Sequence, residues 1–257
     1  MGRAKDIIVK VIPAKVANEF IKKHHYSGKV AATGLVCFGA FLDKKLIGAA
    51  QWGRPINKYL HLHIVENTKW NDFIELNRLV CLDDTPKNTE SRIIRVMLLL
   101  IKRNAPHIKF VISFADATQC GDGTIYRASG FKLVSINNSQ QIYVLPNGKT
   151  MHLMGLQGGQ YGALRKKMLA SGYANAKEYM VKVLKGKQIT GKQLKYIYLI
   201  DKSCKITVPI LPFSKIDEMG AGMYKGVKRP KQAMDSTTVT AAGQNRPGRS
   251  SNTKDKK

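Results

Sequence analysis

The sequence lacks long hydrophobic runs, closely spaced cysteines and a normal share of acidic residues. No stretch of eighteen apolar residues occurs in its 257 residues, so no membrane-spanning helix is predicted, and residues 1–10 lack the apolar segment of a secretory signal. The four cysteines are far apart and form no Cys-x-x-Cys pair, which argues against a disulfide framework and a cysteine-ligated zinc site. We therefore expect a cytosolic protein with reduced thiols.

The scarcity of acids leaves a large positive charge. Asp and Glu number 17 against 43 Lys and Arg, a formal net charge of +26. Residues 1–155 hold 22 basic and 11 acidic residues, whereas residues 156–205 hold 11 and 2, and residues 225–257 hold 9 and 2. Such an excess repels itself unless a polyanion is bound. We predict a nucleic-acid partner and no membrane partner; a surface tuned for solubility is the alternative.

Strand-like and helix-like segments alternate along the first 155 residues. Apolar, β-branched runs predict strands, and the helix after Asn88, its expected N-cap, carries apolar residues at the spacing of one helix face. Strand-helix-strand units with a hairpin imply an α/β fold with a mixed central sheet and flanking helices. The predicted strands are residues 7–12, 35–42, 46–52, 73–82, 110–114, 132–136 and 142–145, and the predicted helices are 14–23, the segment from Asn88 to Asn104, and 123–129.

The composition changes after Met154, which predicts three parts. Residues 1–155 form the core, and residues 156–224 form a basic extension with a helix at 163–184, broken near Gly172. A hairpin of residues 196–200 and 205–210 completes the extension. Residues 225–257 are rich in Lys, Arg, Ser, Thr and Asn with little apolar content, which predicts a disordered basic tail.

Three blocks of sequence carry a resemblance to a known family. They are His-His-Tyr-Ser-Gly at 24–28, Glu-Leu-Asn-Arg-Leu at 75–79, and the segment 113–131, which ends in Tyr-Arg-Ala-Ser-Gly-Phe. Over about residues 5–155 the chain resembles the Mom family of phage DNA-modification proteins, which belongs to the GNAT N-acyltransferase superfamily. The resemblance implies a GNAT-like sheet. It also implies a virus-encoded enzyme that forms N6-(methylcarbamoyl)adenine in viral DNA in the host cytoplasm and so evades host restriction.

Other functions remain open. An N-acetyltransferase acting on an aminomethyl-uracil base, as in thymidine hypermodification, fits the same superfamily. A non-catalytic nucleic-acid-binding protein on a GNAT-like scaffold is the alternative from another class, and an acyltransferase for a protein or small amine is a third. The oligomeric state is also open, with a homodimer among the candidates.

The candidate catalytic residues lie in two places. Asp116 follows an apolar strand at the edge where α/β folds bind ligands, so we expect a general base, and a loop-stabilising aspartate is the alternative. Tyr126 matches the tyrosine that protonates the departing thiolate in GNAT enzymes, or else packs as a structural aromatic. The loop of His24, His25, Tyr26 and Ser27 is predicted to take up a proton, to bind a metal or to stack on an extruded base.

The candidate binding residues are mostly basic. Lys87, Asn88, Ser91 and Arg92 open the central helix and are predicted to hold the phosphates of a donor, for which acyl-CoA (acetyl-CoA) is a candidate. The segment has no glycine, unlike the usual GNAT loop, and Glu90 opposes an anion.

The remaining binding predictions concern DNA and metal. Asn77 and Arg78 are predicted to bind substrate, although Arg78 has Asp83 or Asp84 as rival partners. Basic residues of the extension are expected to hold the DNA backbone: Arg165, Lys166 and Lys167. His61 and His63 are expected on one side of an extended segment without a third ligand, so no metal site is predicted. Iron is a candidate cofactor through the resemblance alone.

Overall fold

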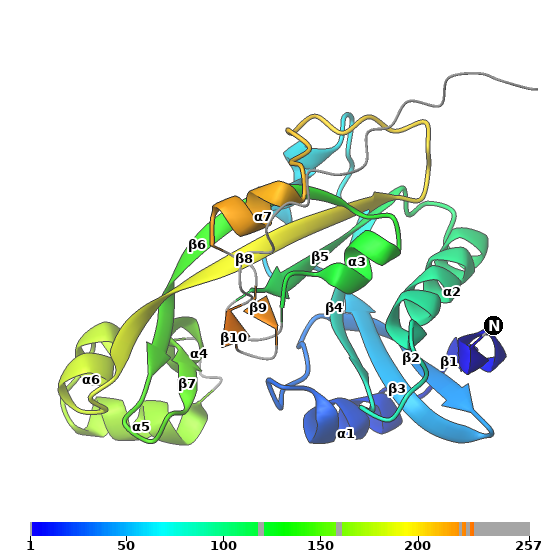
Figure 1. Ribbon diagram of the computed structural model, residues 1–257. Helices are drawn as coiled ribbons and strands as arrows, with labels where there is room; N and C mark the ends of the chain where they lie inside the picture. The colour runs from blue at the N-terminus through cyan, green and yellow to red at the C-terminus, as the bar shows by residue number, and fades with distance from the viewer. Residues whose placement is uncertain (1, 118–120, 158–160, 221–222, 225–226, 229–257) are drawn as a thin grey trace, which may run out of the picture.

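One eight-stranded sheet organises the protein. The structure, a computed structural model, describes residues 2–117, 121–157, 161–220, 223–224 and 227–228 (Figure 1). The strands follow the order β1-β2-β3-β4-β5-β8-β6-β7, and every neighbouring pair is antiparallel except β4 and β5. The strands are β1 (Ile8–Val11), β2 (Gly34–Leu42), β3 (Lys45–Gly53), β4 (Phe73–Cys81), β5 (Phe110–Asp116), β6 (Lys132–Val144), β7 (Thr150–His152) and β8 (Lys187–Leu199), with a separate pair β9 (Met223–Tyr224) and β10 (Val227–Lys228). The predicted α/β fold with a mixed sheet and flanking helices is confirmed.

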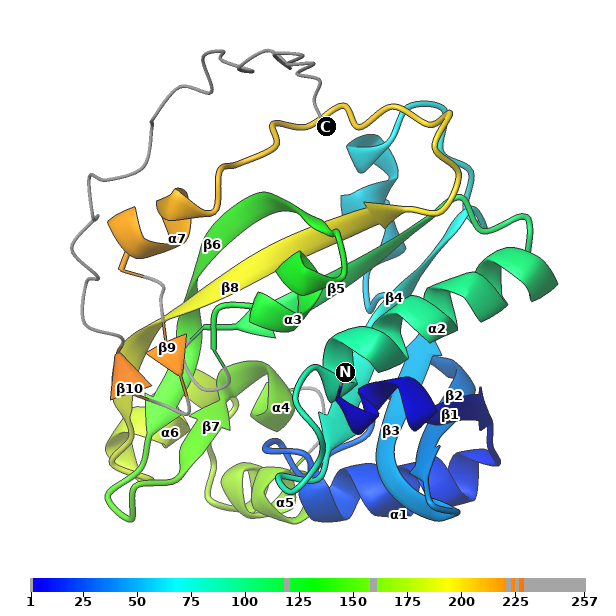
Figure 2. The ribbon, with the colours of Figure 1, turned by 45° about the vertical axis from the view of Figure 1, so that its right-hand side comes forward.

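Helices cover both faces of the sheet (Figure 2). They are η1 (Arg3–Asp6), α1 (Ala14–His24), η2 (Lys58–Ile64), α2 (Thr89–Asn104), α3 (Thr124–Ala128), α4 (Leu153–Gln157), α5 (Gly162–Ala170), α6 (Ala176–Lys182) and α7 (Ser214–Glu218). Side chains alternate between the faces along a strand. Ala50 packs in the cluster that contains the α2 side chain Met97, whereas its neighbour Ala49 packs with the α1 side chain Ile21. Thus α2 and α1 cover opposite faces.

The predicted amphipathic helix is α2. Its residues Ile94, Met97, Leu98 and Ile101 are all buried, as their spacing predicted. Asn88 stands at the N-cap, but its side chain makes no capping hydrogen bond and its backbone is left-handed with φ of 69°. The prediction of the cap position is therefore confirmed, while the side-chain cap is absent.

Strand β8 occupies the middle of the sheet although it lies in the predicted extension. It pairs with β5 on one side and with β6 on the other. The predicted hairpin of residues 196–200 and 205–210 is wrong. The first segment ends β8, and residues 205–210 form no named strand, with Ile206 making only an isolated bridge to Val65. The two strands predicted at 132–136 and 142–145 are one strand, β6, with two irregularities in its register.

The far ends of β6 and β8 run out of the core to α4, α5 and α6, which we call the helical lobe (Figure 1). The lobe has its own apolar cluster, which includes Tyr143, Leu156, Met168 and Met180. The predicted helix at 163–184 is two helices, α5 and α6, separated around Gly172, whose φ is 78°. Most of the predicted tail, residues 225–226 and 229–257, lies outside the described residues. No helix within the described ranges has the length and hydropathy of a bilayer span.

Candidate functional site

The parallel pair β4 and β5 separates in the middle of the sheet. Their register runs from Phe73–Phe110 to Leu76–Ser113, and the buried Ser113 hydroxyl donates to the Leu76 carbonyl at 3.2 Å. Beyond that point β4 continues to Cys81 beside β3, and β5 continues to Asp116 beside β8. The pairing of β4 with β5 therefore ends before Asn77. Polar side chains near this point can reach a group bound between the two strands.

A β-bulge at Asn77 collects polar side chains on one face. Trp52 of β3 pairs with Leu76 and Gln51 pairs with Arg78, so Asn77 is the extra residue. Without the bulge, alternation would send Arg78 to the face opposite Asn77. The bulge instead places Glu75, Asn77 and Arg78 together on the face that the α1–β2 loop covers.

Glu75 is the central carboxylate of this group. Burial raises the pKa of Glu75 to about 7, against the opposing effects of the Asn77 side-chain hydrogen bond and the Arg78 charge. A carboxylate with a pKa near neutrality is suited to accept a proton at physiological pH. Sequence reasoning quoted Glu75 within a motif but gave it no role, because a lone glutamate on a strand carries no local signal of burial.

The α1–β2 loop supplies His25 and Ser27. The Nδ1 atom of His25 lies 2.9 Å from the Ser27 hydroxyl and accepts the Ser27 backbone N–H at 3.2 Å. Burial, reinforced by the Arg78 charge, lowers the pKa of His25 to about 4, so the imidazole is neutral at pH 7. Arg78 is fixed to the loop because its Nε donates to the Lys29 carbonyl at 3.0 Å. The structure thus brings the predicted catalytic residues His25 and Ser27 close to Arg78, a predicted substrate-binding residue.

His24 and Tyr26 lie at the outer side of this loop. His24 is exposed and its ring lies 4.5 Å from that of Phe20, measured between centroids. Tyr26 is 55% exposed, with its ring 4.3 Å from that of His25. Tyr26 therefore presents an exposed ring beside His25, while His24 packs against Phe20 of α1.

Close backbone packing beside the cluster requires glycine at position 53. A Cβ atom there would lie 2.1 Å from the Thr33 carbonyl oxygen and 2.5 Å from Asn77 Oδ1, a buried atom without a hydrogen-bond partner. We expect Gly53→Ala to reduce the free energy of unfolding by about 1–3 kcal/mol, because the backbone must shift. Gly162→Ala is the control, since nothing lies within 4 Å of a Cβ there. Urea denaturation of both variants measures the difference, and equal stability would contradict the clash.

The remaining catalytic candidates, Asp116 and Tyr126, lie on opposite faces. Asp116 follows Ala115, which packs in the cluster of α2, so its side chain points to the Glu75 face. Tyr126 is buried on the α2 face, with ring centroids 5.5 Å from Phe131 and 5.2 Å from Tyr196. The structure therefore joins Asp116, but not Tyr126, to the face that carries the histidine loop.

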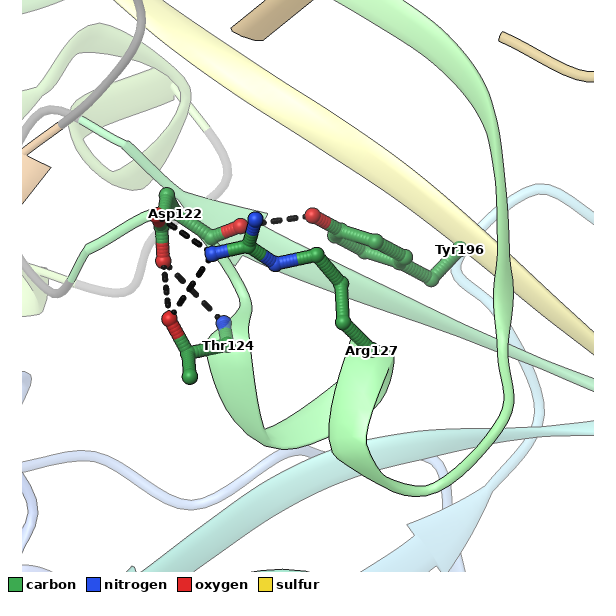
Figure 3. A network of polar contacts seen from close by, with 4 residues as sticks. All are labelled: Asp122, Thr124, Arg127 and Tyr196. Carbon is green, nitrogen blue, oxygen red and sulfur yellow. Dashed lines mark hydrogen bonds and ion pairs between the residues drawn. The ribbon is translucent and has the colours of Figure 1, made fainter. Parts of the chain in front are cut away.

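Much of the block at 113–131 holds α3 in place (Figure 3). The Asp122 carboxylate accepts from Thr124 Oγ1 at 2.6 Å and from Arg127 at 2.7 Å, and the Tyr196 hydroxyl donates to the Asp122 carbonyl at 2.6 Å. Gly123 has φ of 73°, and a Cβ there would lie 2.5 Å from the Tyr196 ring. These residues form a hydrogen-bonded network that holds α3. Part of the sequence block at 113–131 therefore has a structural role.

The predicted donor-binding residues lie at the N-terminus of α2. Lys87, Asn88 and Arg92 are exposed, and Ser91 donates from its hydroxyl to the Asn88 carbonyl at 3.2 Å. The half-buried Glu90 lies in the same first turn. Because Asn88 leaves the helix end without a side-chain cap, its N–H groups and two cations suit an anionic group such as a phosphate.

The predicted DNA-binding residues Arg165, Lys166 and Lys167 are exposed on α5. The N-cap of this helix, Tyr161, reaches the α1–β2 loop, where the Lys29 ammonium lies 3.6 Å from the centroid of its ring. The basic helix therefore borders the cluster around Glu75.

His61 and His63 do not share one side, so that expectation is wrong. They lie in η2, a 3₁₀ helix with three residues per turn, which points residues two apart in different directions. His61 is buried near Phe73 and Phe114, and His63 is exposed. Across the described ranges, no three His, Cys, Asp or Glu side chains are grouped to hold a metal ion. The described residues therefore do not fit an iron site.

The comparisons with known proteins agree on a family. The chain matches the Mom protein family over residues 6–215. It is 34% identical over 137 residues to the methylcarbamoylase mom of Escherichia phage Mu, a match covering 53% of this chain and 56% of that protein, so it spans about half the length of this relative.

Solved structures with a similar arrangement are acetyltransferases. The Escherichia coli ribosomal-protein-S18-alanine N-acetyltransferase has a TM-score of 0.41 at 9% identity, covering 76% of this chain and 94% of its own. An N-acetyltransferase from Staphylococcus aureus Mu50 has a TM-score of 0.40 at 10% identity, covering 76% and 97%. Both TM-scores lie below 0.5, so these likenesses say nothing about the activity or ligands of this chain. The family match, in contrast, spans most of the sequence: the chain belongs to the Mom protein family.

Proposed function

We propose that this chain is a DNA-modifying transferase that joins an acyl-type group to the exocyclic amine of a base. The name methylcarbamoylase of the phage Mu relative favours a methylcarbamoyl group as the group transferred. The resemblance to the Mom family favours adenine N6 as the acceptor and N6-(methylcarbamoyl)adenine as the product. The substrate would be the viral genome in the host cytoplasm, and the modification would protect it from restriction. The observation that carries the proposal is the cluster of Glu75, His25, Asn77 and Arg78 where β4 and β5 part.

The acceptor would reach this cluster from the α1–β2 loop side. A paired base hides its amine, so the base must leave the duplex or come from a single strand. The ionised Glu75 carboxylate takes a proton from the amine as its nitrogen attacks the acyl carbon. A C–N bond forms, and the bond from the acyl carbon to its leaving group breaks, with the electron pair going to the leaving group. Neutral His25 and the Asn77 amide orient the base, and Arg78 holds a nearby phosphate or carbonyl oxygen.

The donor would approach from the α2 side of the sheet. A CoA thioester would supply the activated carbonyl, and for the favoured product it would have to carry a methylcarbamoyl group; an acetyl group from acetyl-CoA would give an acetyl adduct instead. Lys87, Asn88, Ser91 and Arg92 would hold its phosphates at the uncapped helix end. Tyr126 remains the proposed proton donor to the leaving group on this face. Donor and acceptor would thus meet through the opening in the sheet, each from its own face.

Activity should depend on the ionisation of Glu75. Because its pKa is about 7, only its deprotonated fraction acts as the base, so kcat/KM should fall about tenfold per pH unit below pH 7 and level off above it. His25, with a pKa of about 4, is neutral throughout this range. A pH–rate profile between pH 5 and 9 measures the effect. A flat profile across pH 7 would remove Glu75 from the role of base.

Nucleoside mass spectrometry tests the reaction itself. DNA from cells that express the chain should contain a new purine nucleoside with the mass of a methylcarbamoyl adduct. An acyl adduct on an aminomethyl-uracil would support the thymidine-hypermodification alternative instead. No adduct, combined with tight and salt-sensitive DNA binding, would show a non-catalytic binder and overturn the proposal.

A further inference from the structure

A feature distinct from the Glu75 cluster lies at the start of β4. A cavity of about 420 Å³ opens where the start of β4 meets the end of α2. This volume is typical of pockets that bind small organic groups. Both Phe73 and Ile74 line the cavity, and because side chains alternate along a strand, it lies across the start of β4 and not on one face alone. Glu75 does not line it, so the cavity is distinct from the proposed reaction site. Its walls are largely apolar, with contributions from Leu35, Val36, Phe73, Ile74, Ile101 and Ile108.

The polar groups that line this cavity favour an anion. They are Arg54, Lys58, Asn71 and His107, and no acidic residue lines it. Asp72, the acid whose charge reaches Lys58, is paired with Lys109 at 2.9 Å. Burial, reinforced by the Arg54 charge, lowers the pKa of Lys58. A bound anion would relieve the repulsion between these two cations.

An exposed aromatic pair stands next to the cations. Tyr59 is 72% exposed and Trp70 is 42% exposed, with ring centroids 4.8 Å apart. The buried Lys58 ammonium donates to the Trp70 carbonyl and lies 4.8 Å from the centroid of the Trp70 ring. Flat aromatic rings beside fixed cations are the combination that binds unpaired bases and their phosphates.

We propose that this cavity receives an unpaired nucleotide of the bound DNA strand, with its base against the apolar walls and its phosphate between Arg54 and Lys58. The inference rests on the proposed DNA substrate and adds a second point of contact at the start of β4, outside the Glu75 cluster. A fatty carboxylate would match the walls and the cations but would leave Tyr59 and Trp70 without a role. The cavity would thus bind an unpaired base other than the base that is modified.

Trp70 provides the readout. The chain has two tryptophans, and Trp52 is fully buried against Met97, so fluorescence changes on binding report chiefly on Trp70. A single-stranded oligodeoxynucleotide should quench the full-length protein saturably. The same sugar–phosphate strand without bases should bind roughly tenfold more weakly, because it cannot stack. Equal binding by both strands would overturn the proposal.

Three variants test the position of the nucleotide. Arg54→Gln and Lys58→Gln should each weaken binding by roughly tenfold through loss of a charge-assisted contact. Ala105→Phe, which fills the cavity from its lining, should abolish the preference for bases. Lys69→Gln is the matched control, since this exposed lysine adjoins Trp70 but does not line the cavity. Arg54 is exposed, so its variant keeps the fold, and unchanged affinity in it would contradict the proposal.

The same measurement separates this inference from the proposed reaction. Glu75→Gln should retain the quenching of Trp70 even where no adduct forms, because Glu75 does not line the cavity. A chain that binds bases in this way but never modifies DNA would contradict the reaction and support the cavity. A chain that modifies DNA but shows no base-dependent quenching would contradict the cavity alone.

Discussion

Glu75→Gln should lower the rate of adduct formation by about 10²- to 10⁴-fold, the usual contribution of a general base. The substitution keeps the size of the side chain and an oxygen that can accept the Asn77 hydrogen bond, but removes the proton acceptor. Single-turnover formation of the modified nucleoside measures the loss. The matched control is Glu66→Gln, which removes the same charge from an exposed position and should leave the rate within about twofold.

Stability measurements separate a catalytic loss in Glu75→Gln from misfolding. The folded pKa of Glu75 is about 7, against about 4.3 in an unfolded chain. The folded protein therefore binds this proton more tightly, and the contribution of Glu75 to stability declines as pH rises from about 4 through 7. Glutamine cannot ionise, so the variant should be at least as stable as the parent at pH 8. Full activity in a stable variant would exclude Glu75 as the base.

Local sequence patterns identified the elements around the site because those elements depend on local spacing. The apolar spacing of Ile94, Met97 and Leu98 defines α2 whatever it packs against, and the uninterrupted apolar run at 110–114 is typical of a central strand. The end of β5 at Asp116 was likewise recognisable from sequence, because it follows this apolar run, and the role of Asp116 there stays a prediction. The loop that carries His25 and Ser27 was predicted because it comes directly after the apolar pattern of α1.

The parts that sequence patterns missed depend on distant pairing. The central place of β8 is set by its hydrogen bonds to β5 and β6, more than forty residues away in sequence from any partner, and no local pattern records such a choice. The bulge at Asn77 is likewise a property of two strands together. Strict alternation along β4 would place Arg78 and Glu75 on opposite faces. Sequence patterns therefore could not predict that these two side chains share a face. The burial that raises the pKa of Glu75 was likewise not predictable from a local pattern.

The two faces of the sheet present different groups, and we propose a different ligand for each. The α2 side presents the uncapped helix end with Lys87 and Arg92, suited to a small anion. The α1 side presents the Glu75 cluster, and its border is extended by α5 through the contact of Lys29 with Tyr161. The exposed basic residues of α5 lie on this side, so we expect DNA along the α1 and α5 side, with the acyl donor opposite.

Because of this placement, substitutions in α5 test the proposed DNA interface most directly. Replacing Arg165, Lys166 and Lys167 together with glutamine should weaken DNA binding by roughly 10²- to 10³-fold at about 0.1 M salt, because each lost phosphate contact lowers the slope of log affinity against log salt by about 0.9. Fluorescence anisotropy with a labelled duplex over a salt series measures both quantities. The three side chains are exposed on a short helix, so the fold should be unaffected.

The control for the α5 variant removes the same charge elsewhere. Lys5, Lys44 and Lys45 are exposed in η1 and at the β2–β3 turn, away from the Glu75 cluster. Their triple glutamine variant should lose little affinity, because at this salt the Debye length of about 10 Å confines a charge to its own neighbourhood. If both triple variants weaken binding equally, DNA responds only to the net charge of +26, and α5 is not the interface. If only the α5 variant does so, the polyanion lies beside the opening between β4 and β5, where a displaced base can reach Glu75.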